Sequence, residues 1–355
     1  MTEILVGTKK GLFVLEGSPG GTFEIASRSF AGEPVDFAMR DRRTGRTFAA
    51  TGSPFYGPKL WFTDDPAGEW TQVPGVELPE SAGATLVRLW TVVAGEEDGL
   101  LYAGGDPGVL FESRDGGETW ALHQAFWDQP TRPDWQPGGG GMCLHSIVTW
   151  PGDPSRLTMA ISAVGIWLTD DGGQTWRNGN KGIVPRYLPE ESQGEETLTL
   201  CVHNVHRSPA RPERLFLQFH GGVYRSDDAG ESWTAIGDGL PSDFGFPLVV
   251  DPADPDSAYV IPLTADRDRV TPDGHVRVYE TRDAGATWTP RGDGLPTDSA
   301  YLTVLRQAFD REGSGPAMGL YFGATSGDVF GSGDAGATWS TVASHLPPVH
   351  SVRVA

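Results

Sequence analysis

Two cysteine–histidine pairs, each with one residue between its members, are the clearest sign of chemistry in this sequence. Cys143 precedes His145 by two positions, and Cys201 precedes His203 in the same way. Side chains alternate along a β-strand, so a strand would place each cysteine on the same face as its histidine. Thiolate and imidazole suit zinc, iron or copper. The pairs therefore raise the hypothesis of a divalent transition metal as cofactor.

His350 and Asp36 are the further ligands that we expect. In the strand alignment given below they occupy the same position as His145 and His203, in other repeats of the chain. A metal held by these four side chains would polarise a substrate or activate water. The alternative is that the histidines and cysteines are buried packing residues, with the ring nitrogens hydrogen bonded to neighbours such as Ser146.

Arginines on the same strands offer a second kind of site. A guanidinium presents a fork of donors that matches a carboxylate or a phosphate. We expect these arginines either to form an anion pocket at the mouth of a central channel or to pair with nearby acids. They are Arg88, Arg207, Arg306 and Arg353.

Two long connections, residues 121–142 and 177–198, carry aromatic and acidic side chains. Long loops on one face of a rigid scaffold commonly carry function. The aromatic rings can stack on a sugar or another flat ligand, or cap the core. The ligand-binding candidates from these loops are Trp127, Trp135 and Tyr187. The acids that a glycosidase could use are Asp128, Asp134, Glu190, Glu191, Glu195 and Glu196.

An eight-residue repeat defines the elements that must position these residues. Its pattern is Ser/Thr-x-Asp-x-Gly-x-Thr/Ser-Trp, and a period of about 50 residues matches one four-stranded propeller blade. The aspartate is expected to accept hydrogen bonds in a turn, the glycine to supply an unusual backbone conformation, and the tryptophan to anchor the next strand. Full copies begin at Ser113, Thr169, Ser226, Thr281 and Ser332, and weaker copies at Glu16 and Thr63.

An inner strand precedes each blade in the alignment. Its copies begin at Val35, Val87, Leu144, Val202, Gly245, Leu302 and Val349. The second residue of each copy forms a ring around the axis, comprising Asp36, Arg88, His145, His203, Phe246, Thr303 and His350.

The copy at Val349 has no blade after it, and the strands that it lacks stand at the N-terminus. We therefore predict a single all-β domain, residues 1–355, folded as a seven-bladed β-propeller. The C-terminal strand 350–354 closes the ring by joining the N-terminal strands within residues 3–30, which removes open sheet edges.

Composition narrows the choice of partners. The 355 residues carry a net charge of −20, which disfavours nucleic acid and anionic membranes as partners. The N-terminal residues lack the pattern of a secretory signal, and two cysteines are too few for a disulfide framework. We therefore expect a cytoplasmic protein.

The eight-residue box resembles the Asp-box, or BNR, repeat. The chain is similar over nearly its whole length to Asp-box propellers: sialidases, oligoxyloglucan-type glycosidases, sortilin-type receptors and photosystem assembly factors. It looks most like the bacterial cytoplasmic proteins often labelled glycosyl hydrolase or BNR repeat protein. Sialidases carry an Arg-Ile-Pro segment that this sequence lacks, and oligoxyloglucan-type enzymes use two propellers. The resemblance therefore implies a fold and transfers no catalytic residue.

Three functions follow, and the sequence leaves open whether the protein is an enzyme. The first is a small-molecule or modified-peptide site at the loop-rich mouth of the channel, metal-assisted or not. Its catalytic candidates are Asp36, Arg88, His145, His203 and His350, with Arg306 and Arg353 as further ligand-binding residues. The second is a glycosidase acting on a glycan, which needs two carboxylates ~5–10 Å apart. The third is a non-catalytic scaffold for a protein partner.

Overall fold

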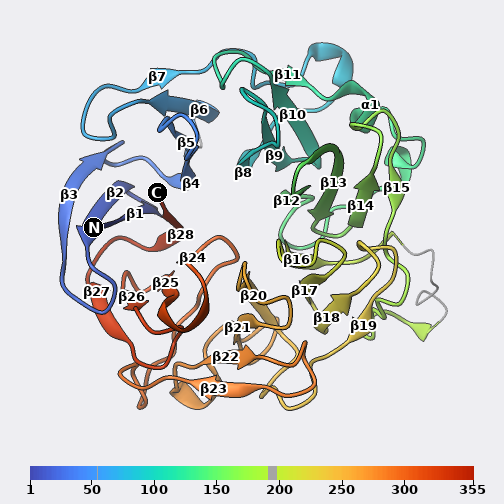
Figure 1. Ribbon diagram of the computed structural model, residues 1–355. Coiled ribbons are helices and arrows are strands. Elements are labelled where there is room, and N and C mark those ends of the chain that lie inside the picture. The colour runs from blue at the N-terminus through green and yellow to red at the C-terminus, as the bar shows by residue number, and fades with distance from the viewer. Residues whose placement is uncertain (54, 191–197) are drawn as a thin grey trace.

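The computed structural model describes residues 1–53, 55–190 and 198–355. These residues form seven four-stranded antiparallel sheets arranged as blades around a central axis (Figure 1). The predicted seven-bladed β-propeller is therefore confirmed. None of the described helices is long and apolar enough to cross a bilayer.

Each blade runs from an inner strand near the axis to an outer strand at the rim. The closing blade contains β28 (Val349–Val354), β1 (Thr2–Thr8), β2 (Gly11–Gly17) and β3 (Phe23–Ser29). The next contains β4 (Val35–Arg40), β5 (Thr47–Ser53), β6 (Gly57–Thr63) and β7 (Thr71–Gln72). It is followed by β8 (Arg88–Ala94), β9 (Leu101–Asp106), β10 (Val109–Ser113) and β11 (Ala121–Leu122).

The remaining blades follow in chain order. One contains β12 (Leu144–Trp150), β13 (Asp153–Ile161), β14 (Gly165–Thr169) and β15 (Arg177–Asn178). The next contains β16 (Val202–Arg207), β17 (Leu215–Phe219), β18 (Gly222–Ser226) and β19 (Thr234–Ala235). The last two contain β20 (Gly245–Val250), β21 (Ala258–Pro262), β22 (Val278–Thr281) and β23 (Thr289–Arg291), then β24 (Phe309–Glu312), β25 (Gly319–Gly323), β26 (Val329–Ser332) and β27 (Ser340–Ala343).

Helical turns occur only in connections of the described chain. They are α1 (Gln124–Trp127) and the 3-10 turns Glu80–Ala82, Arg132–Asp134, Pro272–Gly274 and Gly315–Ala317.

The box aspartates clamp turns, as predicted. In the first full box the Thr119 amide donates to Asp115 Oδ1 at 3.0 Å, and the Gly117 amide donates to Ser113 Oγ at 2.9 Å. Gly117 has φ +88°, and a Cβ there would lie 2.4 Å from the Phe48 ring. Thus both the backbone conformation and the packing require glycine. The same threonine or serine contacts recur at Asp171, Asp228, Asp283 and Asp334.

Closure of the ring also follows the prediction. β28 pairs with β1 in antiparallel register, with Val352 opposite Val6 and Val354 opposite Ile4. Both valines and Ile4 are buried, so the joined blade has a core of its own as well as a hydrogen-bond ladder. The last strand of the chain thus supplies the inner strand of the first blade.

One inner strand was wrongly placed by the alignment. The segment from Leu302 to Gln307 is not a strand, and the inner strand of that blade is β24, Phe309–Glu312. The segment instead enters the centre of the ring, where side chains and backbone from other blades satisfy its polar groups (Figure 1). Its alternating apolar residues resemble a strand because Leu302 and Val304 pack against the core of that blade.

Candidate functional site

The predicted ring of residues exists at one level of the channel because of β-bulges. Among the described inner strands, six carry an extra residue at this level, which locally bends the strand and re-aims the side chain. The interrupted register identifies them as Asp36, Trp90, His145, His203, one residue of Phe246–Pro247, and His350.

Arg88 does not belong to this ring as aligned, since Trp90 occupies the equivalent position of β8. Shifting a strand by two residues leaves every side chain on the same face, so the alternating pattern could not reveal the error. Thr303 is likewise absent from the ring, because its segment is not a strand.

Asp36, Arg88 and His350 nevertheless lie together. Arg88 Nε is 3.4 Å from Asp36 Oδ2, and His350 Nδ1 is 3.3 Å from Asp36 Oδ1. The Asp36 side chain is only 8% exposed, and its carboxylate contacts both the Arg88 guanidinium and the His350 ring. Two of the four predicted metal ligands, Asp36 and His350, are therefore neighbours, and Arg88 contacts the same carboxylate.

His145 has both ring nitrogens engaged. Nε2 lies 2.9 Å from the Val202 carbonyl oxygen, which can only accept, and Nδ1 lies 2.9 Å from Ser146 Oγ. Burial, with a contribution from Arg306, lowers the pKa of His145 well below its ordinary value. This neutral, fully bonded imidazole performs the packing role that the alternative interpretation described.

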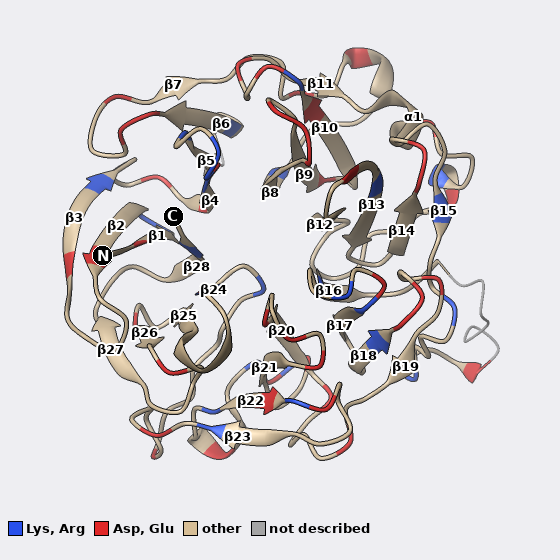
Figure 2. Ribbon diagram, viewed as in Figure 1, with Lys and Arg blue, Asp and Glu red and all other residues tan. Residues whose placement is uncertain are grey.

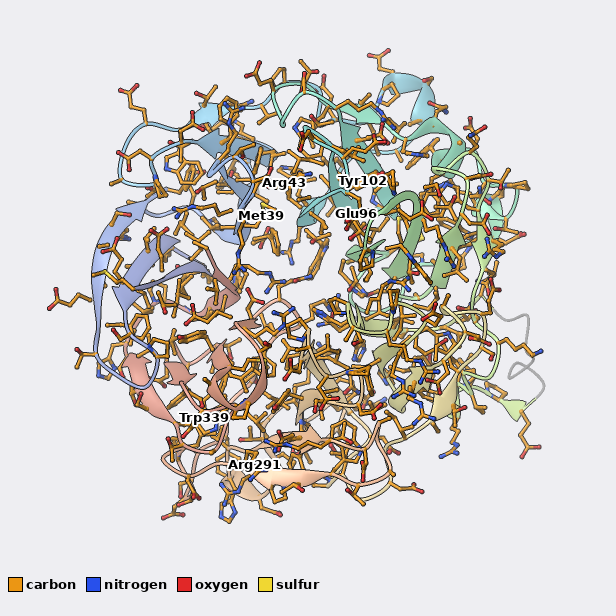
Figure 3. All side chains as sticks on the ribbon, in the orientation of Figure 1. Met39, Arg43, Glu96, Tyr102, Arg291 and Trp339 are labelled. Carbon is orange, nitrogen blue, oxygen red and sulfur yellow. The ribbon has the colours of Figure 1, made fainter. Side chains whose placement is uncertain are left out.

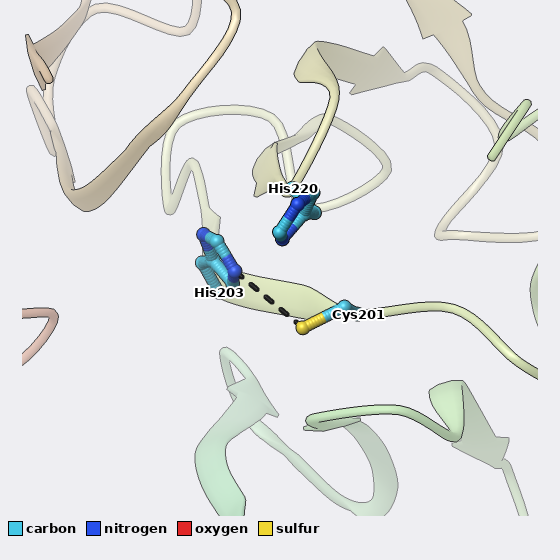
Figure 4. A group of neighbouring side chains, drawn as sticks. All are labelled: Cys201, His203 and His220. Atoms are coloured by element: carbon cyan, nitrogen blue, oxygen red, sulfur yellow. Dashed lines mark hydrogen bonds between the residues drawn. The ribbon is translucent and has the colours of Figure 1, made fainter. Parts of the chain in front are cut away.

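His203 differs from His145 although both sit on bulges. Its Nδ1 donates to the Gly245 carbonyl at 2.6 Å, while Nε2 lies 3.5 Å from Cys201 Sγ. His220, which follows β17, points toward the same space (Figure 4). The structure thus brings Cys201 and His203 together, and adds a histidine that the sequence alignment did not single out.

The aromatic candidates in the long loops have mixed environments. Trp135 is 5% exposed and packs on Phe126 and Trp167 in the core. Trp127 and Trp135 hold the Arg132 guanidinium between them, at 4.0 and 4.4 Å from the ring centroids. Tyr187 is 43% exposed, and its ring lies 4.7 Å from that of His220. Tyr187 is therefore the most accessible of the three predicted stacking residues.

The acids proposed for a glycosidase lie on the surface. Asp128, Asp134 and Glu190 are exposed, and Asp128 accepts hydrogen bonds from Gln124 on the same helical turn. Glu191, Glu195 and Glu196 lie outside the described residues. A general acid needs burial to raise its pKa, and these exposed carboxyls lack it.

The segment before β24 divides the central channel. The Gln307 side chain donates to the His145 carbonyl at 2.6 Å, and Asn204 donates to the Arg306 carbonyl at 3.0 Å. Gln307 also forms a parallel bridge with Ser351 of β28. Arg306 donates to Ser162 Oγ at 3.2 Å. These bonds tie one loop to three other blades, so the segment lies across the axis.

A cavity of about 450 Å³ occupies the channel on the other side of this segment. Its walls are the C-terminal halves of inner strands, and Met39, labelled in Figure 3, is among the lining residues. Neighbouring strands are antiparallel, so these strand ends lie on the same face as the Asp boxes. The cavity thus lies opposite the long loops. Its arginines are Arg40, Arg42, Arg207, Arg311 and Arg353, and Asp310 is its only lining acid in the described chain.

Most of these arginines lack an acidic partner. Within the described residues only Arg40 has a carboxylate at ion-pair distance, that of Glu3 at 2.5 Å. Arg207 is 6% exposed, its terminal nitrogens donate to the Pro212 carbonyl and to Thr158 Oγ1, and its Nε is buried without a hydrogen-bond partner. Arg353 donates to the carbonyls of Gln307 and Val352 and to the Gln307 side chain. Guanidinium groups therefore outnumber carboxylates along the cavity wall.

Burial lowers the pKa values of three of the arginines around the cavity. Burial lowers the pKa of Arg207 to about 10 and also lowers the pKa of Arg311 and of Arg353. Basic segments lie beside the channel on β8 and β28 as well as at the rim, and acidic segments are spread over the connections (Figure 2). A protein of net charge −20 thus keeps an arginine cluster in the middle.

The predicted arginine set contained Arg207 and Arg353 but not Arg40, Arg42 or Arg311. One signal was present, because Arg40 and Arg207 end their inner-strand copies at the same aligned position. Arg311 was hidden by the misplaced strand at Leu302. Arg306, expected in the same pocket, lies on the other side of the dividing segment near Ser162.

Comparison with known proteins identifies relatives of the fold. No family model matches the chain. A xyloglucanase from Paenibacillus sp is 25% identical in an alignment of 339 residues. The match covers 81% of this chain. The chain spans only 30% of that xyloglucanase.

Solved structures with the same fold have different functions. A putative 6-phosphogluconolactonase from Bacteroides uniformis aligns with TM-score 0.59 and 13% identity, over 100% of this chain and 99% of that chain. An ancestral GH74 enzyme gives TM-score 0.56 and 15% identity, over 84% of this chain and 36% of that one. YCF48 bound to D1 peptide gives TM-score 0.54 and 14% identity, over 90% and 85%. The chain is thus a seven-bladed β-propeller similar to GH74, YCF48 and lactonase-like propellers.

Proposed function

We propose that this chain is a binding propeller for an anionic ligand, held in the arginine-lined cavity at the Asp-box end of the channel. The observation that carries the proposal is the set of arginines without carboxylate partners around Asp310. Arg311 and Arg353 would supply guanidinium donors for a carboxylate or phosphate. The ligand class is a small carboxylate or phosphate compound, or the carboxylate end of a peptide.

The energetics support binding over a purely structural role. Clustered guanidiniums repel one another, and burial removes the water that would screen them. An anion bound near Arg311 and Arg353 would offset that repulsion. A volume of about 450 Å³ lies within the range of small-molecule sites. The similar fold of YCF48 bound to D1 peptide supports a propeller of this size as a peptide-binding scaffold.

Calorimetric titration with citrate and with inorganic phosphate tests the proposal. Arg311→Gln and Arg353→Gln should each weaken citrate binding about tenfold or more, because a hydrogen bond to a charged group contributes about 1.5–3 kcal/mol. Arg114→Gln removes an exposed arginine at the rim and should leave binding unchanged. Equal citrate affinity in the wild type and both cavity variants, or no binding of either anion to the wild type, would refute the proposal.

A second candidate, glycoside hydrolysis, concerns the long-loop mouth. Burial raises the pKa of Asp106, which is what a general acid requires. Arg88 is opposite Asp106 in the strand register and its side chain contacts Asp36, so a second carboxyl lies at the same end of the channel. The identity to a xyloglucanase favours a glycan as substrate.

Release of reducing sugar from xyloglucan oligosaccharides tests this candidate. Activity should fall at least about 100-fold in Asp106→Asn, the usual minimum contribution of general acid catalysis. Exposed Asp134→Asn should retain activity. Activity that survives Asp106→Asn, or a wild type without activity, would remove the candidate.

A further inference from the structure

The opposite end of the channel, near the start of β16, contains a cluster of one thiol and two imidazoles. Cys201 precedes β16, His203 is its bulged residue, and His220 follows β17 (Figure 4). The His220 amide donates to the Cys201 carbonyl at 3.0 Å, which fixes the two backbones side by side. Each residue offers one ligand atom, and these atoms all lie within 4.8 Å of one another.

From this convergence we infer that Cys201, His203 and His220 form a binding site for a transition metal, with Zn²⁺ as the ion that fits best. Zinc takes thiolate and imidazole at ~2.3 and ~2.0 Å in a tetrahedron, so its ligand atoms stand roughly 3–4 Å apart. Cys201 Sγ and His203 Nε2 are already 3.5 Å apart. A small rotation of the partly exposed His220 ring completes the set.

The orientation of His203 favours a ligand role. The Gly245 carbonyl accepts from Nδ1 at 2.6 Å, so Nδ1 carries the proton and the lone pair of Nε2 points toward Cys201. Metal-binding histidines are commonly held this way, with the second nitrogen donating to a carbonyl. The Asp266 carboxylate is the corresponding second-nitrogen neighbour of His220, since His220 Nε2 lies 4.0 Å from Asp266 Oδ2.

Cys143 and His145 provide an internal comparison with the same spacing. Cys143 donates toward the Gly140 carbonyl at 3.2 Å, and both nitrogens of His145 are bonded elsewhere. Only the second pair has a free lone pair facing the thiol, and only it has a third residue beside it within the described chain. The difference between the pairs therefore lies in their surroundings.

Positive groups border the cluster without entering it. Arg306 and Arg269 lie near enough to the Cys201 thiol to interact with it electrostatically. The Arg269 guanidinium lies over the Phe244 and Phe246 rings. A zinc–thiolate pair carries less charge than a bare ion, so nearby guanidiniums are tolerable. Three protein ligands leave a fourth position open to water or to a substrate, the arrangement of catalytic zinc sites.

A reactive cysteine–histidine dyad is the competing interpretation. A dyad uses one histidine beside the thiol, whereas ligand nitrogens of both His203 and His220 lie within 4.8 Å of Cys201 Sγ. The three-residue geometry therefore favours a metal over a nucleophile.

The test is metal titration of the full chain after treatment with a chelator. We expect one Zn²⁺ per chain by mass spectrometry and a thiolate-to-metal charge-transfer absorption with Co²⁺. Cys201→Ser should abolish that absorption, and His220→Gln should weaken Zn²⁺ binding at least about tenfold, as one lost ligand or its support does. Cys143→Ser is the matched control and should behave as the wild type.

Two results would overturn the inference. One is a wild type that binds neither Zn²⁺ nor Co²⁺, and the other is an unchanged Co²⁺ spectrum in Cys201→Ser. Thermal unfolding of each metal-free variant checks folding, because the His220 ring also packs against the rings of Tyr187 and Phe244. The result is independent of anion binding, because the Gln307 segment separates the two sites.

Discussion

The Gln307 side chain donates a hydrogen bond to the backbone carbonyl of His145 at 2.6 Å, although 162 residues separate the two in sequence. The bond joins the segment before β24 to the inner strand β12, and the two belong to blades that are not neighbours in the ring. Gln307 is 5% exposed, so its amide has no water to replace this carbonyl. The dividing segment is thus fixed by hydrogen bonds to other blades, although it lacks the continuous backbone hydrogen bonds of a strand.

Replacing Gln307 with alanine should destabilise the protein by about 1–3 kcal/mol, because the buried His145 carbonyl loses its donor. Urea unfolding followed by tryptophan fluorescence measures the change. Gln124→Ala removes an exposed amide that bonds Asp128 and should leave the midpoint unchanged. Identical midpoints for both variants would mean that the crossing segment contributes no stability.

Glu280→Gln should lower the free energy of unfolding by about 2 kcal/mol. Burial acts to raise the pKa of Glu280, but hydrogen bonds from Tyr259, Arg282 and Arg291 lower it overall. A glutamine would aim an amide donor at one of these donors. The cost stays below that of a fully buried pair, since Arg282 and Arg291 reach solvent. Thermal unfolding measures it, with exposed Glu118→Gln as the control.

The pH dependence of stability should include Asp171. Hydrogen bonds from the Thr175 hydroxyl and amide lower the pKa of Asp171 from 3.8 to about 2. A carboxyl with a depressed folded pKa stabilises the fold fully above its unfolded pKa and progressively less as pH falls toward the folded pKa. The stability gap between wild type and Asp171→Asn should therefore narrow between pH of about 4 and about 2.

Urea midpoints across that pH range measure the gap. Asp170→Asn changes the adjacent exposed acid and should run parallel to the wild type. A gap that is constant with pH would show that Asp171 does not titrate as described.

His206 should report an anion in the channel. Burial lowers its pKa to about 3, and Arg353 and Arg311 push it in the same direction. An anion would offset both guanidiniums, so bound citrate should raise the pKa of His206. NMR titration with and without citrate measures this, with His206→Gln to assign the resonance. Exposed His275 lies outside the cavity, and its resonance should not respond.

Ala229→Gly should stabilise the protein by about 0.5–1 kcal/mol. Ala229 has φ +66°, and a left-handed conformation costs an L-residue about 1–2 kcal/mol, part of which the entropy of glycine offsets. Two other boxes already have glycine here, Gly116 and Gly172. The reverse change, Gly172→Ala, should lower the melting temperature. If both changes act in the same direction, backbone strain is not the cause.

Local patterns made the fold predictable. The hydrogen bonds of a box span four residues, so Asp115 and Gly117 define their turn without help from the rest of the chain. Closure was also readable, because the Val349 copy lacked a blade and the N-terminal strands lacked an inner strand. These are repeated, short-range signals, and seven copies reinforce one another.

The site depended on signals that repeats do not carry. Period-two alternation does not distinguish Arg88 from Trp90 as the ring residue of β8. The same alternation wrongly predicted an inner strand that begins at Leu302. His220 joins Cys201 through a turn whose course no motif specifies. Channel residues meet across the ring, so their distances follow from the placement of whole blades, which spacing along the chain does not encode.

The pairing of β28 with β1 has a mechanical consequence. The strands are antiparallel with Val354 opposite Ile4, so both chain ends leave the sheet at the same side. A force that pulls the ends apart would load the hydrogen bonds one pair at a time, from Ile4 toward Thr8, as in opening a zipper. The ring should therefore resist thermal unfolding through the contacts among its seven blades, yet open under a small force applied at its two chain ends.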